Sequence, residues 1–175
     1  MGRRGAFRAV MTGLFLGLCL LAVGSNALPG FAIEAEAAGT SRVLQVEGAI
    51  AGGGTASFDL AALKALPAVT IKTTTPWTDH EDTYVGVRVR DLLDHLGAKG
   101  TSVIASAVDD YAVSIPMRDL RDYDVIIAYA MDGKPLPLDD KGPYWIIYPF
   151  SAETALQTDI YFSRSVWQLK RLTVE

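Results

Sequence analysis

Cysteine is almost absent from this sequence of 175 residues, and its single copy, Cys19, lies close to the N-terminus. If the N-terminal segment is removed, the remaining chain has no disulfide, no thiolate nucleophile and no cysteine ligand for a metal. Histidine is also scarce. Neither His80 nor His95 is accompanied by a serine or cysteine in a motif such as G-x-S-x-G, so the sequence gives little support for hydrolase chemistry.

The chain also lacks a hydrophobic run long enough to span a membrane. Arginines precede an apolar stretch over residues 9–23, which is shorter than the ~20 residues that a membrane-spanning helix needs. Small residues at 25–27 supply a cleavage site, so we predict a secretory signal peptide over residues 1–27 and a periplasmic location. An uncleaved anchor and a later cleavage at 35–38 remain as alternatives.

Positive charge is in short supply as well. The formal net charge is −4, and removal of residues 1–27 makes it more negative because that segment carries arginines and no acidic residue. Such a surface repels phosphate backbones, so nucleic acid is excluded as a partner. Residues 28–41 are rich in Ala, Gly and Glu and predict a flexible leader, whereas residues 42–175 predict one continuous domain.

Short alternating segments dominate this domain, and helical periodicity is confined to brief stretches. No G-x-G-x-x-G motif opens a helix, which argues against a dinucleotide-binding fold. The pattern predicts a mixed α+β domain dominated by sheet. We expect a helix capped by Asp59, a second over residues 89–96 that ends at Gly97, and a short helix or turn over 116–123. The expected strands are 43–47, 55–58, 69–74, 83–87, 102–107, 111–115, 125–130, 144–148 and 166–174.

The two histidines are the first candidates for a site. His95 falls near the end of the second helix, where the helix dipole favours a surface imidazole. His80 lies in the acidic run 79–82, whose side chains are of the types that bind zinc or a hard cation. Consecutive side chains rarely converge on one ion, so we interpret this run as a solvated turn and predict no metal site.

Hydroxyl, carboxylate and aromatic residues gather at several strand ends and suggest a small-molecule cradle. Trp145 and Trp167 are interpreted as core packing, while Trp77, in a polar loop stiffened by Pro76, is divided between packing and ligand stacking. The candidate ligand-binding residues are Thr74, Thr75, Trp77, Asp109, Asp110, Tyr111, Gly142, Tyr148 and Arg164.

Two groups of short motifs stand out, namely Met131–Leu136, Lys141–Pro143 and the last strand in the C-terminal part, and the strand into Trp77 with the segment Tyr84–Leu93 before them. In order and spacing they resemble the C-terminal half and the first half of the sulfite-oxidase-type molybdopterin-binding domain. The similarity covers nearly all of residues 43–175. It implies a sulfite-oxidase-like fold with mixed β-sheets and a few short helices.

Two departures from the family bear on activity. The family ligates molybdenum through a cysteine shortly before the tryptophan, and this chain has Thr73 at that position. A hydroxyl is a poor substitute for a soft thiolate. The family also holds the cofactor phosphate with basic residues, whereas this chain offers Arg164 and then Val166–Gln168. Both departures argue against a working molybdenum enzyme and leave the pterin part of the site in place.

The chain is similar to small periplasmic members of this family that bind free reduced pterins as signals. The similarity implies a non-catalytic sensor with no tightly bound cofactor, whose partner is an inner-membrane diguanylate cyclase/phosphodiesterase. For such a ligand we expect stacking on Trp77, Tyr111 or Tyr148. The remaining expected roles are acceptance of two pterin N–H groups by Asp109 or Asp110, and hydrogen bonds to the ring carbonyl or a polyol tail from Thr74, Thr75 and Arg164.

Two other functions remain open. One is a molybdopterin-dependent oxidoreductase that works without a cysteine ligand. The other is a protein-interaction module in which side chains fill the old pocket, so that no small molecule binds.

Overall fold

A computed structural model of the protein describes residues 43–175. The predicted signal peptide, the predicted leader and Cys19 lie outside the described residues. Within residues 43–175, no helix is long and apolar enough to cross a membrane.

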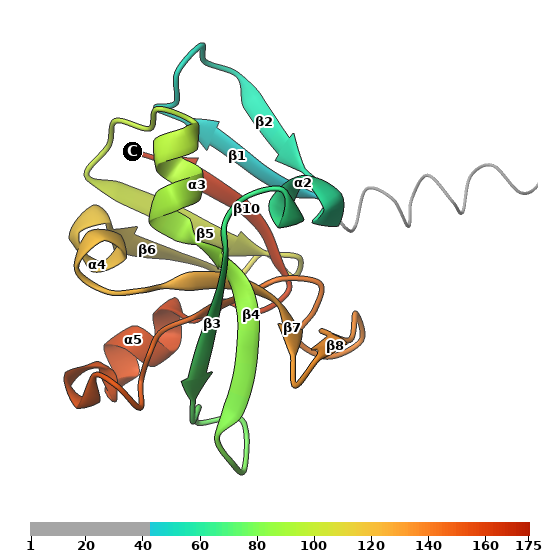
Figure 1. Ribbon diagram of the computed structural model, residues 1–175. Coiled ribbons are helices and arrows are strands. Elements are labelled where there is room, and N and C mark those ends of the chain that lie inside the picture. The colour runs from blue at the N-terminus through green and yellow to red at the C-terminus, as the bar shows by residue number, and fades with distance from the viewer. Residues whose placement is uncertain (1–42) are drawn as a thin grey trace, which may run out of the picture. The chain divides into compact units, whose positions relative to one another are not determined.

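Two five-stranded sheets form the framework, of which the first is mixed and the second is antiparallel (Figure 1). The first sheet has the strand order β2-β1-β10-β5-β6, and β1 pairs with β10 in parallel while its other pairs are antiparallel. Its strands are β1 (Leu44–Gly48), β2 (Thr55–Phe58), β5 (Ser102–Ala107), β6 (Ala112–Pro116) and β10 (Leu169–Val174).

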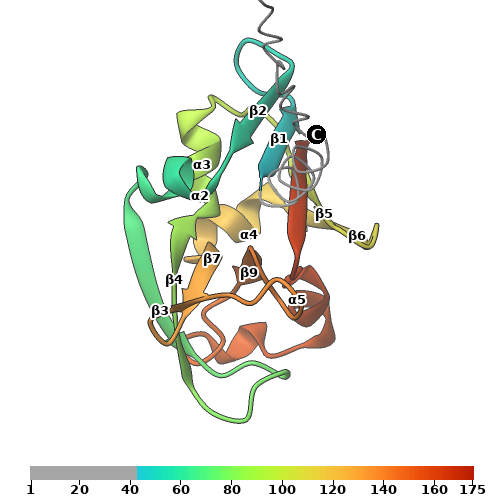
Figure 2. The same ribbon diagram turned by 90° about the vertical axis from the view of Figure 1, so that its right-hand side faces the viewer.

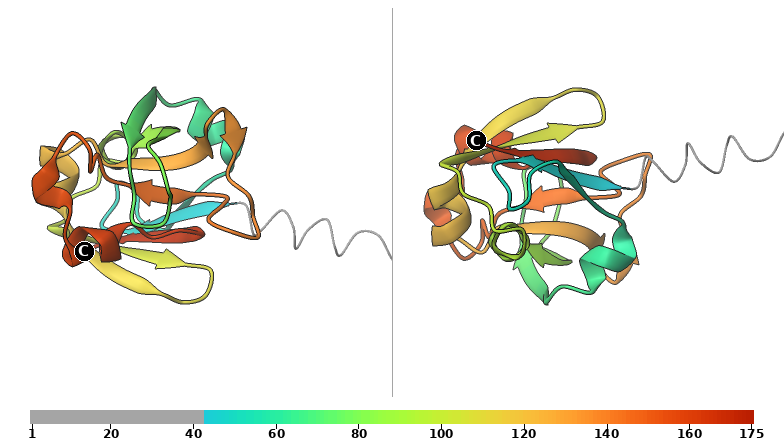
Figure 3. Two further views of the ribbon diagram at one scale, coloured as in Figure 1. Left: turned by 90° about the horizontal axis from the view of Figure 1, so that it is seen from below. Right: turned by 90° about the horizontal axis from the view of Figure 1, so that it is seen from above.

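The second sheet is antiparallel and has the order β3-β4-β7-β8, with β9 also paired to β7. Its strands are β3 (Ala68–Thr73), β4 (Asp82–Arg88), β7 (Ile126–Met131), β8 (Lys134–Pro135) and β9 (Trp145–Ile147). Seen end-on, the first sheet and the second sheet form separate layers (Figure 3).

The main core lies between these layers, and the alternation of each strand determines which side chains enter it. In β5 the buried positions are Val103, Ala105 and Ala107, and the residues between them are half-buried. In β7 the side chains are buried on both faces. Ile127 joins the main core, while Ile126 joins a smaller cluster with Tyr84 and Trp145 on the other face. Burial of this apolar area is the main stabilising contribution.

Short helices lie beside the sheets, with α2 (Leu60–Lys64) and α3 (Val89–His95) on one side and α5 (Asp159–Arg164) lower on the other side in Figure 2. In α2, the backbone N–H of Ala62 donates to Asp59 Oδ1 at 2.8 Å, which confirms Asp59 as the cap. Gly97 follows α3 with φ +58°, as expected of a residue that ends a helix. Two more short segments, α4 (Met117–Asp122) and a 3₁₀ turn (Thr154–Leu156), are also helical.

The sequence patterns did not predict α5, and they placed the start of the last strand three residues too early. No residue of α5 is fully buried, so the segment carries no apolar period from which a helix could be inferred. The last strand begins at Leu169 and not at Val166, because Gln168 has φ +45° and interrupts the extended backbone. Both features lie beside the candidate site.

Candidate ligand-binding site

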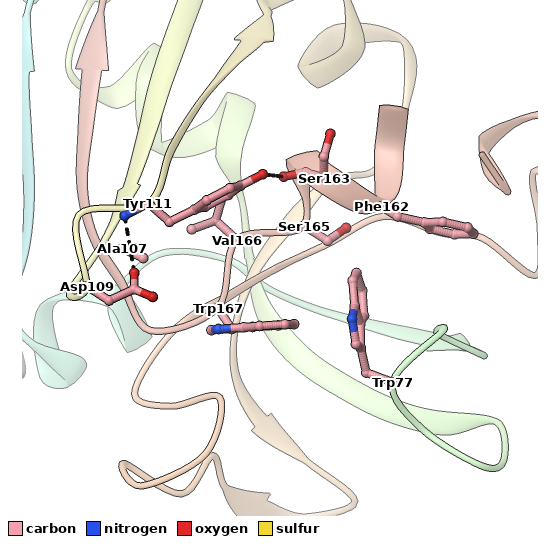
Figure 4. A pocket seen from close by; sticks show the side chains of 9 residues that line it. All are labelled: Trp77, Ala107, Asp109, Tyr111, Phe162, Ser163, Ser165, Val166 and Trp167. Carbon is pink, nitrogen blue, oxygen red and sulfur yellow. Dashed lines mark hydrogen bonds between the residues drawn. The ribbon is translucent and has the colours of Figure 1, made fainter. Parts of the chain in front are cut away.

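A cavity of about 310 Å³ opens beside the β5–β6 turn and α5 (Figure 4). Its size is at the lower end of the range of small-molecule pockets. Four aromatic side chains line the cavity, and one carboxylate and two serine hydroxyls add polar groups. The lining residues are Trp77, Ala107, Asp109, Tyr111, Phe162, Ser163, Ser165, Val166 and Trp167.

Trp77 is the centre of the aromatic wall. Its ring contacts Trp167 at a centroid distance of 5.3 Å, Phe162 at 6.2 Å and Trp145 at 5.8 Å, all in edge-to-face geometry. Trp145 is fully buried and donates its indole N–H to Ser165 O at 3.1 Å. The wall is therefore held in place by the core beneath it.

The loop after β3 orients Trp77. Thr75 is buried, and its Oγ1 accepts a hydrogen bond of 3.3 Å from the backbone N–H of Trp77. The same Oγ1 lies 3.0 Å from Thr78 Oγ1. Thr75 does not line the cavity itself, and its role is to position Trp77, which does line it.

The β5–β6 turn brings Asp109 and Tyr111 to the cavity. Asp109 Oδ1 accepts from the backbone N–H of Tyr111 at 3.2 Å, and the Tyr111 hydroxyl donates to Ser163 O at 2.9 Å. This second bond ties the turn to α5. Asp110 has φ +66°, is exposed and does not line the cavity, so Asp109 is the carboxylate that reaches it.

Two of the lining rings remain accessible to solvent. Tyr111 is 46% exposed and Trp167 is 37% exposed. In Figure 4 these rings lie on opposite sides of the space, with Asp109 toward one end and Trp77 toward the other. Exposed large aromatic rings beside a carboxylate offer both stacking surface and a hydrogen-bond acceptor to a heteroaromatic ligand.

Trp167 was interpreted from the sequence as packing, yet it lines the cavity. Its position follows from Gln168, whose side-chain amide donates to Asp140 O at 2.8 Å and to Leu138 O at 3.3 Å. With its positive φ, Gln168 turns the chain just before β10 begins. The polar run Ser163–Ser165 directly before this tryptophan was the available signal that the segment faces a site.

Thr73 lies at the end of β3, fully buried. Its Oγ1 accepts a hydrogen bond of 2.9 Å from the backbone N–H of Ser151 and lies 3.1 Å from Thr74 O. Ser151 Oγ in turn accepts from the backbone N–H of Thr74 at 2.9 Å. These contacts engage Thr73 and Thr74 with the loop after β9, and neither residue lines the cavity.

Three other candidates also lie away from the cavity lining. Tyr148 is fully buried, and burial raises the pKa of its hydroxyl strongly. Arg164 forms an ion pair of 2.6 Å with Asp119, which is 1% exposed. Gly142 is buried, and a Cβ there would lie 2.3 Å from Leu136 O. Among the predicted ligand residues, the cavity thus brings together Trp77, Asp109 and Tyr111.

The family resemblance implies molybdenum as a metal for this fold, and the side chains present do not match its donor requirements. Residues 43–175 contain no cysteine, and the hydroxyl of Thr73 is already engaged by Ser151. Molybdenum coordination by a protein thiolate therefore does not fit the residues that are present. The aromatic cavity offers ring surfaces and one carboxylate.

Comparisons with known proteins identify the family of the chain. The chain matches the family model of the oxidoreductase molybdopterin binding domain over residues 36–174, and it belongs to that family. It is similar to the structure of the sulfane dehydrogenase SoxCD from Paracoccus pantotrophus, with 19% identity and a TM-score of 0.58. The match covers 77% of this chain and 38% of that chain. The predicted sulfite-oxidase-like fold is confirmed. No curated protein matches the chain.

Proposed function

We propose that this protein binds a free reduced pterin in the aromatic cavity and acts as a non-catalytic ligand sensor. The observation that carries the proposal is the combination of accessible Tyr111 and Trp167 rings with the Asp109 carboxylate in one cavity of about 310 Å³. A pterin is flat and heteroaromatic, so it stacks on such rings.

Asp109 supplies the recognition step. The pyrimidine edge of a pterin presents two adjacent N–H donors, and a carboxylate accepts both at once. Asp109 Oδ1 already accepts from Tyr111, which fixes the carboxylate in orientation and leaves Oδ2 and the second lone pair of Oδ1 for the ligand. The hydroxyls of Ser163 and Ser165 lie in the same wall and can accept hydrogen bonds from a polar substituent.

The absence of catalysis in this proposal rests on Thr73. Its buried hydroxyl stands where the family resemblance expects the metal-binding cysteine, and Ser151 holds it. A site of this kind binds its ligand and releases it unchanged. The location that we propose is the periplasm, on the basis of the signal-like residues 1–27.

The output that we propose is regulation of an inner-membrane diguanylate cyclase/phosphodiesterase through its periplasmic domain. Support comes from the resemblance to small periplasmic pterin-binding proteins. The cavity wall also forms part of the surface, since its Tyr111 and Trp167 side chains are exposed, and so is Val108 next to the lining residues Ala107 and Asp109. A partner that contacts this surface would meet a different set of atoms when the cavity holds a ligand.

Family membership favours a second function, that of a molybdopterin-dependent oxidoreductase without a protein thiolate. Metal content separates the two functions. The interaction-module alternative predicts a cavity filled by side chains, and the open volume beside Trp77 counts against it.

The test begins with the protein isolated from its native periplasm under reducing conditions. Extracted small molecules are identified by mass spectrometry, molybdenum is measured by elemental analysis, and the melting temperature is recorded with and without reduced neopterin. We expect a bound pterin or a rise in melting temperature, and no stoichiometric molybdenum. Failure to find a pterin and absence of any thermal shift together reject the proposal, and stoichiometric molybdenum replaces it with the oxidoreductase.

A further inference from the structure

A second set of chemically active side chains lies away from the aromatic cavity, where the β3–β4 connection meets the β7–β8 turn. His80 Nε2 is 2.8 Å from Asp82 Oδ1, and Asp132 lies close to both. One possible ligand atom from each of the three residues lies within 4.8 Å of the others. We propose that His80, Asp82 and Asp132 form a binding site for a divalent transition-metal ion, with zinc as the preferred ion.

The sequence objection to a site here was that residues 79–82 are consecutive. The fold removes that objection because only His80 and Asp82 of this run take part, and the third ligand, Asp132, comes from the turn between β7 and β8. Antiparallel pairing of β4 with β7 places Tyr84 opposite Met131, which brings Asp132 beside Asp82. The ligands therefore come from two segments joined by a hydrogen-bonded ladder.

The carboxylate of Asp82 is the strongest part of the argument. It is 1% exposed, and within residues 43–175 its only ion-pair partner is His80, which is 72% exposed. Burial of a carboxylate is costly unless a cation or several donors compensate for it. An imidazole carries at most one positive charge, whereas a divalent ion would neutralise Asp82 and Asp132 together.

Each carboxylate is also oriented by a protein donor on one oxygen. Tyr84 OH donates to Asp82 Oδ2 at 3.3 Å, which leaves Asp82 Oδ1 toward His80. The backbone N–H of Thr83 donates to Asp132 Oδ1 at 2.9 Å, and Asp132 N–H donates back to Thr83 O at 2.9 Å. Such outer contacts are the usual support of metal ligands, and they hold two of the three ligands before an ion arrives.

The geometry requires little movement to reach a metal site. Bonds of about 2.0–2.2 Å from zinc to nitrogen and oxygen ligands place neighbouring ligand atoms roughly 3–3.6 Å apart. The exposed His80 side chain can adjust toward the two carboxylates, which Tyr84 and the Thr83 backbone already orient. One imidazole with two carboxylates favours zinc over magnesium or calcium, which prefer oxygen ligands alone.

The site would act on the loop that carries Trp77. Thr78 Oγ1 is 3.4 Å from His80 O, and the same Oγ1 is 3.0 Å from Thr75 Oγ1, which orients Trp77. An ion that fixes His80 therefore tethers the far end of this loop to β4 and β7. The expected consequence is a more stable domain, through binding to the folded state alone.

The chain supplies its own matched control, because His95 is a second exposed histidine at the end of α3. The full-length protein is purified through a tag without histidine, stripped with chelator, and titrated with Zn²⁺ by isothermal calorimetry. We expect one Zn²⁺ per chain, and at least tenfold weaker binding for His80→Ala and for Asp132→Asn. His95→Ala should bind as the unmodified protein does.

Two further measurements test the ligands and the choice of ion. Co²⁺ titration should give visible absorption bands that His80→Ala lacks, and Mg²⁺ and Ca²⁺ should bind at least tenfold more weakly than Zn²⁺. Equal zinc affinity in His80→Ala, or equal loss in His95→Ala, overturns the assignment. Equally tight binding of Ca²⁺ or Mg²⁺ overturns the choice of ion, because His80 would then not be a ligand. None of these outcomes depends on whether a pterin binds.

Discussion

The backbone N–H of Ser151 donates a hydrogen bond of 2.9 Å to Thr73 Oγ1, across 78 positions of the chain. This contact joins the end of β3 to the loop that follows β9. It occurs at the position where the family resemblance expects a metal-binding cysteine, and it gives the hydroxyl there a structural partner. The Thr73 side chain therefore acts as a hydrogen-bond acceptor for the backbone of this loop.

Replacement of Thr73 tests that role. Thr73→Val keeps the shape but leaves the Ser151 N–H without its acceptor, which should lower the free energy of unfolding by about 1–3 kcal/mol. Thr73→Ser keeps the oxygen and loses one methyl group, worth about 0.8 kcal/mol. Urea denaturation measures both. A valine variant as stable as the unmodified protein would show that this hydrogen bond is unimportant.

Asp109→Asn should reduce affinity for a reduced pterin by tenfold or more. The amide keeps an oxygen for the Tyr111 N–H but loses the charge that accepts two N–H donors together. Asp110→Asn is the matched control, since Asp110 is exposed, does not line the cavity and has a positive φ that asparagine tolerates. Calorimetric titration compares the two, and an equal loss in both would contradict the assigned role of Asp109.

Trp167→Ala should weaken pterin binding with little effect on stability. The ring is 37% exposed and forms one wall of the cavity. Loss of about 1.4 kcal/mol of stacking and burial corresponds to tenfold in the dissociation constant. Trp145→Ala is the contrast, because that ring is fully buried and its removal should cost about 3–5 kcal/mol of stability. Ligand quenching of tryptophan fluorescence and thermal melting separate the two effects.

Gly142→Ala should destabilise the domain. The added Cβ would lie 2.3 Å from Leu136 O and 2.5 Å from Pro137 O, both rigid backbone atoms. An effect of about 1–3 kcal/mol is expected for such overpacking. Gly133→Asn serves as the comparison, since a Cβ there meets nothing within 4 Å and asparagine tolerates φ +75°. Equal melting temperatures for the two variants would contradict this prediction.

Asp124 should make stability depend on pH at the acid end. Its hydrogen bond to Arg88, with help from Arg90, holds the pKa of this carboxyl below its ordinary value of 3.8. The stabilisation is therefore complete above pH 3.8 and is lost as the pH falls through the lower folded-state value. Because Asp124 is 45% exposed, the effect should stay below about 1 kcal/mol. Denaturation of Asp124→Asn from pH 7 to pH 3 should show the difference from the unmodified protein shrinking below pH 4.

Local patterns predicted most of the fold. The alternation in β1 and β5, the cap at Asp59 and the ending at Gly97 all depend on neighbouring residues, and the structure confirms them. Strand β8 and α5 were missed because one is a two-residue strand and the other buries no residue completely. A period cannot be read from so short or so exposed a segment.

The candidate sites were harder to predict because they depend on contacts between distant segments. Trp77, Asp109 and Tyr111 were named from local chemistry, but Trp167 enters the same cavity only because Gln168 turns the chain before β10. Likewise, Asp132 reaches Asp82 through the register of β4 on β7. Neither the turn nor the register has a signature in the neighbouring sequence.

The parallel pairing of β1 with β10 joins the two ends of this domain within one sheet. Strand β10 is the last strand of the chain, yet it lies between β1 and β5 in the first sheet. Strands β1 and β5 do not pair with each other, so the first sheet is incomplete until β10 takes its place between them. Contacts between the two ends of a domain are closed late and slow its folding. The docking of β10 between the β1–β2 pair and the β5–β6 pair is therefore the step that completes the first sheet.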